Sequence, residues 1–492
     1  KHMKHIKFYL FLSVILIASS VSNAQINSKI AQEITVSKLG FTNASDFGFS
    51  PAASGVENAK ALQKAVDQTG TIVVSQTGTY KMAVTVYVGS NTTLIFGNNI
   101  FLKKVDEQGT FSHVITNKGA ITRVYDQNIS IQGLQIIVNG MDIRKFKEAV
   151  GLHGQLAFFY VKDLNIDRFR CMDLGKAQYG IQVCTFEDIV INDLIIKGKK
   201  DGVHLGRGKR FRISNGVFET GDDAIALNAH DYTVGNPELG WIQDGVVDNC
   251  YDMAGDKSAG YFCRILGGAW IDWKPGMEVQ NSDAVVANGR VYRVKANADG
   301  KIYKSITEPS HATGIQMLDS INWAMVQNDV VYTAGVRNVV FRNIFLEKPR
   351  TSFSVHFDND KYSRSYYPGA DIPKQEQLTF DNIRVLHDQP TELFSIGTPM
   401  DVVTISNSSI RNNKITFRGN KAMTDYLKTK INIYGCVFNQ KGLMTLINNS
   451  VNGKEVYLKT SSNIELNADF SALIVPGNGK ITVDSDLTGL KK

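Results

Sequence analysis

One short pattern occurs three times between residues 164 and 217: Leu164-Asn-Ile-Asp-Arg-Phe, Ile189-Val-Ile-Asn-Asp-Leu and Phe211-Arg-Ile-Ser-Asn-Gly-Val. In each copy apolar residues alternate with polar ones, which is the period of a β-strand with one buried face. The copies begin 25 and 22 residues apart. A strand pattern that recurs at this interval indicates a solenoid in which every coil adds one rung.

The same pattern extends along the chain in both directions. Because no coil can bury its inner face alone, the coils are expected to stack with parallel strands about 4.8 Å apart. An antiparallel sandwich would need hairpin turns between neighbouring strands, and these are scarce in the repeats. We therefore predict an all-β chain, folded as a right-handed parallel β-helix over residues 71–492. The further copies are Asn128-Ile-Ser-Ile-Gln-Gly-Leu, Val339-Val-Phe-Arg-Asn-Ile, Leu378-Thr-Phe-Asp-Asn-Ile, Val402-Val-Thr-Ile-Ser-Asn and Ile431-Asn-Ile-Tyr-Gly-Cys.

Two segments depart from the repeat. Residues 58–68 have the apolar spacing of a short helix, and we expect this helix to cap the solenoid as part of an N-terminal segment over residues 25–70. Residues from about 266 to 315 break the period and contain several short strand patterns. They predict an inserted small β subdomain, and loops on a rigid scaffold are where function is commonly carried.

The first 24 residues have the features of an export signal. Lys4 and Lys7 precede an apolar run over residues 8–21, and small residues follow at Ser22-Asn23-Ala24. The run is short for a membrane span, although an uncleaved anchor is the alternative, and no later stretch is long enough to cross a bilayer. We expect a secreted or periplasmic protein that has no membrane span once its signal peptide is cleaved.

The net charge and the cysteine content bear on the class of ligand, on metal binding and on disulfides. The formal charge is +7, and removal of the three lysines of the signal leaves +4, without the basic runs of a nucleic-acid-binding protein. A mild positive balance suits an acidic polysaccharide, and equally an ordinary solvated surface. The five cysteines lack the spacing of a metal site. At most Cys250 and Cys263 form a disulfide, and the others are expected to fill the core.

The strongest chemical signal is a pair of acidic segments one coil apart, Lys200-Asp201-Gly-Val-His-Leu and Thr220-Gly-Asp222-Asp223-Ala-Ile-Ala-Leu-Asn. The two spacings are 21 and 22 residues against a local repeat of 22, so the three aspartates are expected to meet on adjacent rungs. Ionising all of several crowded carboxyls costs free energy because their negative charges repel one another, so the pKa of at least one should rise. A protonated carboxyl beside ionised ones provides the acid and the base of glycoside hydrolysis.

Alternation along the strands sorts the three aspartates. Asp201 and Asp223 share the parity of the inward-facing apolar residues that follow them, so strict alternation would bury both. Gly202 and Gly221 allow a corner or bulge that turns them outward. A purely structural ladder of aspartates bonded to turn amides is the alternative. Asp222 is the residue expected to face the substrate most plainly.

These segments resemble glycoside hydrolase family 28, the polygalacturonase and rhamnogalacturonase group. Its members carry Asn-Thr-Asp-Gly followed by Gly/Gln-Asp-Asp-Cys-x-Ala, where this chain has Lys-Lys-Asp201-Gly and Gly-Asp222-Asp223-Ala-Ile-Ala. The start at Asp46-Phe-Gly is similar to that of pectin-lyase-like β-helices. The resemblance implies that Asp222 is the general acid, that Asp201 and Asp223 hold the attacking water, and that the reaction inverts the anomeric centre.

The chain also departs from the family pattern. The Gly-His-Gly motif is missing, and the family's Arg-Ile-Lys appears as Arg264-Ile-Leu. A lysine that helps to hold a substrate carboxylate is thus absent, which bears on the pectin-like or other acidic substrate that the resemblance implies. His204 and His230 are suited to replace the lost histidine, although a lone histidine is more often structural. Arg264 can clamp a carboxylate or form an ordinary ion pair.

Aromatic residues add a second, independent signal. Three of the four tryptophans follow the double aspartate within 50 residues. Such a cluster is suited to stack on sugar rings, or else to pack the insertion onto the solenoid. The predicted sugar-binding residues of this segment are Trp241, Trp270, Trp273 and Lys274.

Two other functions fit the same fold. A polysaccharide lyase would use clustered aspartates as Ca²⁺ ligands, together with a basic group. Lys199, Lys200, Arg207 and Lys209 offer that group. A non-catalytic glycan binder or adhesin would make no chemical demand on the aspartates. The sequence favours a glycoside hydrolase without metal or cofactor that acts on a polysaccharide or oligosaccharide, with Ca²⁺ expected only for the lyase.

Overall fold

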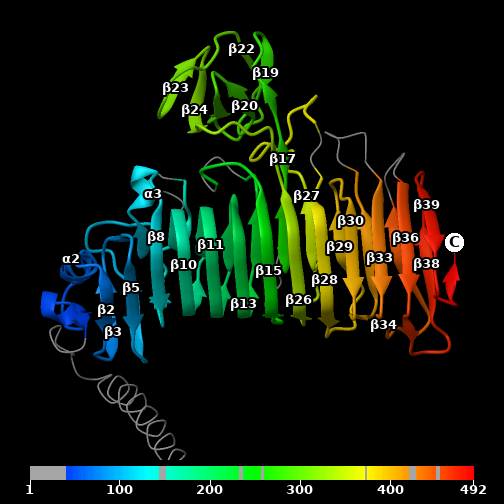
Figure 1. Cartoon of the computed structure of the whole chain (residues 1–492), viewed down its shortest axis with the longest axis horizontal. Helices are drawn as coiled ribbons and strands as arrows, with labels where there is room; N and C mark the ends of the chain where they lie inside the picture. Colours follow the sequence, from blue (N-terminus) through cyan, green and yellow to red (C-terminus); the bar gives the residue numbers. More distant parts are fainter. Residues whose placement is uncertain are drawn as a thin grey trace, which may run out of the picture.

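The protein is a parallel β-helix that carries a small β subdomain on one side (Figure 1). The computed structural model describes residues 40–142, 151–231, 236–255, 260–371, 374–419, 428–449 and 455–491. The predicted signal peptide and residues 25–39 lie outside these ranges. One parallel sheet of 31 strands winds along the long axis in the described chain, which confirms the predicted all-β solenoid. No helix of the described ranges is both long and apolar enough to span a bilayer.

Each coil adds strands to three faces. The first face contains β1 (Phe41–Asn43), β2 (Gly70–Val74), β5 (Thr92–Phe96), β8 (Asp126–Gln132), β10 (Gly154–Leu174), β11 (Tyr179–Gly198), β13 (Gly208–Thr220), β15 (Ile242–Asp252), β26 (Val336–Leu346), β28 (Glu376–Val385), β30 (Val402–Ser406), β33 (Thr429–Tyr434), β36 (Glu455–Ser461) and β39 (Lys480–Asp484). The second face adds β3 (Gly78–Met82), β6 (Ile100–Lys104), β9 (Gln135–Ile137), β31 (Ser409–Ile410), β34 (Val437–Phe438) and β37 (Ile464–Glu465). The third face adds β4 (Val86–Val88), β7 (Ile115–Asn117), β12 (Val203–Leu205), β14 (Ile225–Asn228), β16 (Cys263–Leu266), β27 (Phe353–His356), β29 (Thr391–Ile396), β32 (Asn413–Phe417), β35 (Leu443–Asn449), β38 (Ser471–Val475) and β40 (Leu490–Lys491). The long strands β10, β11, β13, β15, β26 and β28 run around a corner from the first face to the second.

The Asn and Asp residues of the repeat turn the chain from the first face to the second. Asp193, Asn215, Asn249 and Asn343 all have a φ between 52° and 55°, in the left-handed region. Asn and Asp adopt this conformation more readily than other residues that carry a Cβ. A single left-handed residue bends the backbone without breaking the ladder, which explains why β13 continues through its corner.

Apolar residues of successive copies stack inside the solenoid. Leu164 pairs with Ile189, and Ile189 pairs with Phe211, at the steps that the sequence predicts. The next position along this stack is Gly245. A Cβ there would lie 2.1 Å from the Phe211 ring, so the glycine leaves the space that the ring fills. Stacked rings and branched chains of this kind make one continuous core.

Near residue 402 the observed register differs from the predicted one by one residue. Leu378 pairs with Val403, not with Val402. Val403 then pairs with Ile431, where the next copy begins as predicted. The apolar residues Val402 and Val403 are adjacent, so the pattern alone allows either to face inward.

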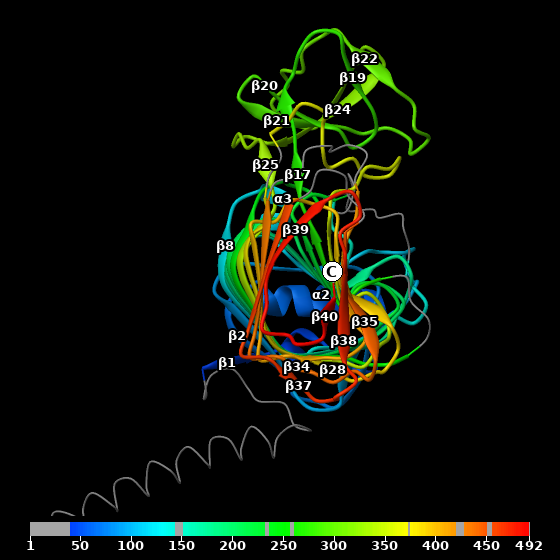
Figure 2. The same ribbon diagram turned by 90° about the vertical axis from the view of Figure 1, so that its right-hand side faces the viewer.

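The N-terminal end of the solenoid is covered by α2 (Gly55–Val66), which follows a short 3₁₀ helix, η1 (Ala44–Phe47). Figure 2 shows α2 lying across the interior at this end. The helix starts three residues before the predicted one, because Ser54 and Glu57 form a capping box. Leu62 and Ala65 are fully buried, as expected for a cap. A second short helix, α3 (Gly119–Thr122), lies beside β10.

The inserted subdomain extends further than the sequence pattern suggests. Its stem is the pair β17 (Gly268–Ala269) and β25 (Thr333–Ala334), so the insertion ends near residue 334 and not near 315. The subdomain has a hydrophobic core of its own, in which Trp323 is fully buried. Its remaining strands are β18 (Ile271–Asp272), β19 (Met277–Val279), β20 (Ala284–Ala287), β21 (Arg290–Val294), β22 (Tyr303–Ser305), β23 (Ile315–Leu318) and β24 (Ile321–Gln327).

All five cysteines are buried free thiols. The disulfide considered for Cys250 and Cys263 is therefore not formed. Cys250 lies on β15 and Cys263 on β16, which belong to different faces, and both side chains are packed in the core. The expectation that cysteines act as small apolar residues applies to both.

Candidate active site

Three aspartates converge where the chain enters the third face. Asp201 lies two residues before β12, and Asp222 and Asp223 lie just before β14. Because Val203 of β12 pairs with Ile225 of β14, Asp201 lies beside Asp223 on neighbouring rungs. One carboxylate oxygen from each of the three lies within 4.8 Å of the others. The one-coil spacing thus brings the trio together, as the sequence predicts.

The three carboxyls differ in exposure. Asp222 exposes 32% of its side chain, whereas Asp201 exposes 4% and Asp223 is buried. Strict alternation explains this difference, since Asp201 and Asp223 share the parity of the core residues. Gly202 does not turn these two carboxyls outward. A Cβ at Gly202 would lie 2.7 Å from the Phe218 ring, so the glycine leaves space for this core side chain.

Lys200 lies among the three carboxyls. Its Nζ donates a short hydrogen bond to Asp222 Oδ2 and lies 3.4 Å from Asp201 Oδ1. The same ammonium lies 5.7 Å from the centre of the Tyr179 ring, on the preceding rung. Burial opposes the charged form of Lys200, but the charges of Asp201 and Asp222 outweigh it and raise the lysine pKa above its ordinary value. The raised pKa favours the charged form of Lys200 at neutral pH.

His204 supports Asp201 from the other side. Its Nδ1 lies 3.1 Å from Asp201 Oδ2, and its Nε2 lies 3.5 Å from a carboxylate oxygen of Asp231. The ring stacks on Tyr179 with a centroid distance of 4.3 Å. His204 is fully buried, so it orients Asp201 from within the protein. Its predicted role in sugar binding stays a prediction.

Electrostatics separate the two buried carboxyls. Burial alone would raise the pKa of Asp201, but Lys200 and the hydrogen bond with His204 outweigh burial and lower it to about 2. Burial, followed by the charges of Asp201 and Asp222, raises the pKa of Asp223 well above its ordinary value. The crowding therefore leaves the proton on Asp223 and the negative charge on Asp201, and sets an acid beside a base.

Backbone contacts hold the turn that carries Asp222. Lys348 Nζ donates to the carbonyl of Thr220 at 2.7 Å, and Arg350 Nη1 donates to the carbonyl of Asp222 at 2.8 Å. The Arg350 guanidinium is itself fixed by two hydrogen bonds to Asp252, at 2.6 and 3.0 Å. Both charged side chains of this pair are at least 95% buried. The turn is thus clamped from beneath by residues that follow the subdomain in sequence.

The chain that enters β16 lies directly against the aspartate pair. A Cβ at Gly260 would lie 2.3 Å from the carbonyl carbon of Asp222, so only glycine fits this approach. The next amide, that of Tyr261, donates a hydrogen bond of 2.9 Å to Asp223 Oδ1. Tyr261 thereby connects the trio to the open pocket beside it.

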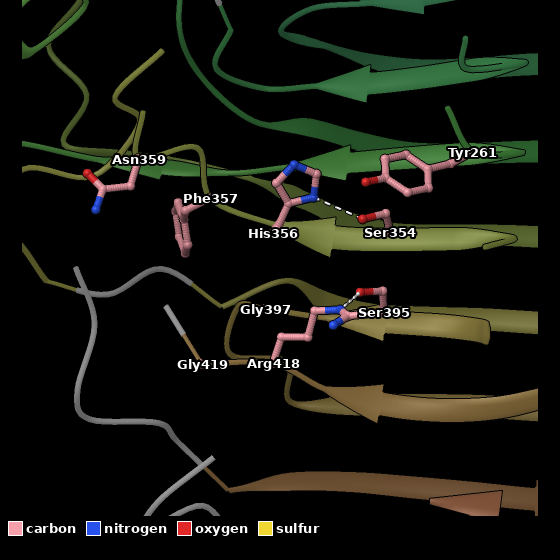
Figure 3. Close-up of a pocket in the computed structure, with 9 residues that line it drawn as sticks. All are labelled: Tyr261, Ser354, His356, Phe357, Asn359, Ser395, Gly397, Arg418 and Gly419. Carbon is pink, nitrogen blue, oxygen red and sulfur yellow. Dashed lines mark hydrogen bonds between the residues drawn. The ribbon is translucent and has the colours of Figure 1, made fainter. Parts of the chain in front are cut away.

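That pocket has a volume of about 350 Å³ and lies over the third face. Figure 3 shows His356 hydrogen-bonded to Ser354 and Arg418 hydrogen-bonded to Ser395 on neighbouring strands, with Tyr261 on the next rung. Hydroxyl, imidazole and amide groups of this kind recognise sugar hydroxyls. The lining residues are Tyr261, Ser354, His356, Phe357, Asn359, Ser395, Gly397, Arg418 and Gly419.

Arg264 reaches toward both the trio and the pocket. It lies on β16 beside Ala226 and Ser354 of the neighbouring rungs. Its Nη2 donates to both oxygens of Asp358, at 2.8 and 2.9 Å. Burial opposes ionisation of Asp358, but Arg264 and then His356 outweigh it and hold its pKa well below the ordinary range. Arg264 therefore has a buried carboxylate partner, and its predicted contact with substrate stays a prediction.

The other predicted sugar-binding residues lie in the subdomain or at its stem. His230 is fully buried with its ring 6.0 Å from that of Trp270, and burial and then Arg293 lower its pKa well below the ordinary value. Trp270 is 2% exposed. These positions favour packing of the subdomain over open stacking on sugar. Trp241 donates to Thr333 Oγ1, Trp270 to the Val331 carbonyl and Trp273 to Ser305 Oγ, while Lys274 is exposed on the subdomain.

Sequence reasoning missed several residues of this site. From the sequence, Lys200 is a candidate only for the base of a lyase, although its place next to Asp201 signals a contact. Tyr179 lies one coil before Asp201 and could have been found by the same spacing. His356 and Arg350 follow the insertion, so no one-coil spacing relates them to the aspartates.

Comparison with known proteins supports the fold and gives no information on the chemistry of the site. No known protein family and no curated protein matches the sequence. The A-module of the mannuronan C-5 epimerase AlgE4 from Azotobacter vinelandii aligns at 11% identity and a TM-score of 0.52, over 92% of this chain and 100% of the module. This alignment shows the shared parallel β-helix fold alone.

Two further solved structures align less closely. The Family 28 exopolygalacturonase of Yersinia enterocolitica aligns at 11% identity and a TM-score of 0.44, over 92% of this chain and 76% of that enzyme. The surface adhesin PfbA of Streptococcus pneumoniae aligns at 13% identity and a TM-score of 0.43, over 92% and 98% of the two chains.

Neutral replacements of the two buried carboxyls are expected to change stability in opposite directions. The contribution of Asp201 is present above about pH 4 and is lost as the pH falls toward 2, because its pKa is lowered in the folded protein. Asp201→Asn should therefore destabilise the protein by roughly 2 kcal/mol at pH 7. The raised pKa of Asp223 means that its ionisation opposes folding at neutral pH, so Asp223→Asn should stabilise by about 0.5–2 kcal/mol.

Urea unfolding at pH 7 and pH 4 measures both effects. The effect of Asp223→Asn should shrink at pH 4, where the unfolded carboxyl becomes protonated, whereas the effect of Asp201→Asn should persist at pH 4 and be lost only as the pH falls toward 2. In Asp223→Asn the new amide oxygen can still accept the Tyr261 N–H, so this variant tests charge and not packing. Shifts of the same sign in the two variants would contradict the assignment of the proton to Asp223.

Proposed function

We propose that the protein is a secreted or periplasmic glycoside hydrolase that cleaves a polysaccharide or oligosaccharide at the aspartate trio. The observation that supports this most is the convergence of three carboxyls, one with a raised pKa and one with a lowered pKa. Hydrolysis of a glycosidic bond needs such an acid and such a base. The proposal includes no metal or other cofactor.

The exposure of the three carboxyls supports the division of roles that the family resemblance implies. Asp222 is the exposed member, so we assign it the transfer of the proton to the leaving oxygen. Asp201 and Asp223 lie behind it and are assigned to the attacking water. Because the trio retains one proton, which rests on Asp223 when no substrate is bound, Asp222 acts as the acid after that proton is shared within the trio.

The anomeric outcome proposed from the resemblance is inversion. The carboxylate oxygens lie within 4.8 Å of one another, whereas inverting enzymes commonly separate their two carboxyls by about 6.5–9.5 Å. Inversion therefore requires the water to sit beside the trio and not between its members. Proton NMR of the first product formed tests this, and we expect the anomer opposite to that of the substrate linkage.

The proposed substrate is a pectin-like or other acidic glycan. The pocket next to the trio contains two basic side chains, His356 and Arg418, and no acidic one among its lining residues. Arg418 is bound by Glu392, with Nη2 to oxygen distances of 2.7 and 2.8 Å, so its charge is partly balanced. Its side chain is nevertheless 56% exposed and can contact a sugar carboxylate at the pocket rim.

The position of Lys200 bears on the rival lyase. The ammonium contacts Asp222 and lies 3.4 Å from Asp201, so it competes with Ca²⁺ for carboxylates that a lyase would use as ligands. Its raised pKa also makes it a poor base for removing a proton beside a uronate. Both features favour hydrolysis over Ca²⁺-assisted elimination.

A glycan screen with two readouts tests the proposal. Purified protein is incubated with pectic, algal and host glycans, and new reducing ends and ultraviolet absorbance of unsaturated product are followed with and without a chelator. We expect reducing ends without absorbance, at a rate that the chelator leaves unchanged. Absorbance that the chelator abolishes would show a lyase, and glycan binding without any product would show a non-catalytic binder.

A further inference from the structure

Lys200 is the one described residue that places a positive charge inside the aspartate trio. Its side chain is 25% exposed, and it contacts Asp222 and approaches Asp201 within 3.4 Å. The Tyr179 ring supports the ammonium from the preceding rung. The next lysine, Lys199, is exposed, which makes the two neighbours a matched pair for experiments.

The charges around Lys200 are unequal. On its rung and the next lie Asp201, Asp222 and Asp223, and the positive charge of Arg264 also acts on Asp201 and Asp223. Arg264 is bound to Asp358, so its charge is already paired. His204 faces Asp201, and Lys348 and Arg350 donate to backbone carbonyls beneath the turn. Lys200 is thus the direct cationic partner of Asp222.

We propose that Lys200 is a positioning residue of this site. Its ammonium balances the charge of Asp201 and Asp222. This balance lets the trio retain one proton and sets the pH range in which the trio works. This role in catalysis rests on the proposed hydrolase function. Glycoside hydrolase family 28 has threonine in its Asn-Thr-Asp-Gly segment where this chain has Lys200. The proposed role of the lysine is therefore specific to this chain.

Removal of the ammonium has a defined consequence for the pH dependence of the reaction. An opposite charge within about 4–6 Å lowers the pKa of a carboxyl by about 1–3 units. Without Lys200, ionisation of the trio is harder, so the pKa values of its acid and of its base both rise. Both limbs of the bell-shaped kcat/KM profile should therefore move to higher pH.

The first experiment compares the pH profiles of Lys200→Met, Lys199→Met and the unaltered protein on the glycan that the screen identifies. We expect both limbs of the Lys200→Met profile to shift upward by about one pH unit or more, with Lys199→Met unchanged. A Lys200→Met profile that loses rate equally at every pH would show a merely structural role and would overturn the proposal.

The second experiment needs no substrate. Amine acetylation of the unaltered protein near pH 8 is followed residue by residue by mass spectrometry, because only the neutral amine reacts. Each unit by which the pKa of Lys200 is raised slows its labelling by about tenfold. We expect slow labelling of Lys200 and faster labelling in Asp222→Asn, with Lys199 the same in both proteins.

The two experiments separate the two levels of inference. If Lys200 labels as fast as Lys199, the ion pair does not exist in solution and the proposal for Lys200 is wrong, whatever the protein hydrolyses. If Lys200 is protected and no glycan is cleaved, the hydrolase function is wrong, and with it the catalytic role of Lys200. A protected Lys200 together with shifted pH limbs supports both.

Discussion

Asp222→Asn is expected to lower kcat on the preferred glycan by about 10²- to 10⁴-fold, the usual contribution of a general acid. The reason is geometric, since Asp222 is the exposed carboxyl of the trio and the one that can reach a leaving oxygen. Asn preserves the size of the side chain, and its amide oxygen can still accept the 3.2 Å hydrogen bond that the Asp223 amide donates to Asp222 Oδ1, although the ion pair with Lys200 is lost. Reducing-end assays and far-ultraviolet circular dichroism measure turnover and folding on the same sample.

A substrate with a better leaving group identifies the acid among the three aspartates. An aryl glycoside whose phenol needs little protonation should recover most of the lost rate in Asp222→Asn. Asp201→Asn should show no such recovery, because it acts on the water. Asp163→Asn is the control, since Asp163 is exposed at a corner where Asn adopts the same left-handed backbone. Full turnover in Asp222→Asn, or recovery only in Asp223→Asn, would refute the assignment to Asp222.

The fold was predictable because one local rule repeats along the chain. Alternation marks the inner face of each strand, and an Asn or Asp at a fixed place supplies the left-handed corner, as at Asn215. The rule is ambiguous where two apolar residues are adjacent, as at Val402 and Val403. It fails at the subdomain, where antiparallel strands replace the coil and no local pattern marks the return near residue 334.

The contacts of the site could be predicted from sequence where they join residues that are one coil apart. Asp201 and Asp223 are one coil apart, and their meeting follows from the spacing. Arg264 and Ser354 are also on adjacent rungs, yet the subdomain separates them by 90 residues in sequence. The tryptophans illustrate the converse, because residues that cluster in sequence near Trp270 pack the stem of the subdomain and do not line the pocket. Nearness in sequence and nearness in a solenoid are different quantities wherever a coil is interrupted.

Arg350→Met is expected to lower the free energy of unfolding by about 3–5 kcal/mol at pH 7, the usual cost of removing one partner of a buried ion pair. Arg350 is 5% exposed and its partner Asp252 is 1% exposed, so the variant leaves a carboxylate buried without its main donor. It also removes the hydrogen bond to the Asp222 carbonyl, so turnover should fall together with stability. Urea unfolding followed by fluorescence measures the first effect.

The pH dependence distinguishes this loss of a charge partner from a simple loss of packing. Burial already raises the pKa of Asp252, although Arg350 opposes it, and without the arginine that pKa must rise further. A carboxyl with a raised pKa in the folded protein is least costly when protonated, so the deficit of Arg350→Met should shrink as the pH falls toward 4. Arg342→Met is the matched control, because Arg342 is 43% exposed in its pair with Asp248 and should cost at most about 1 kcal/mol. A deficit that is equal at pH 7 and pH 4 would mean that Arg350 stabilises the turn by packing alone, and the clamp beneath Asp222 would then not depend on charge.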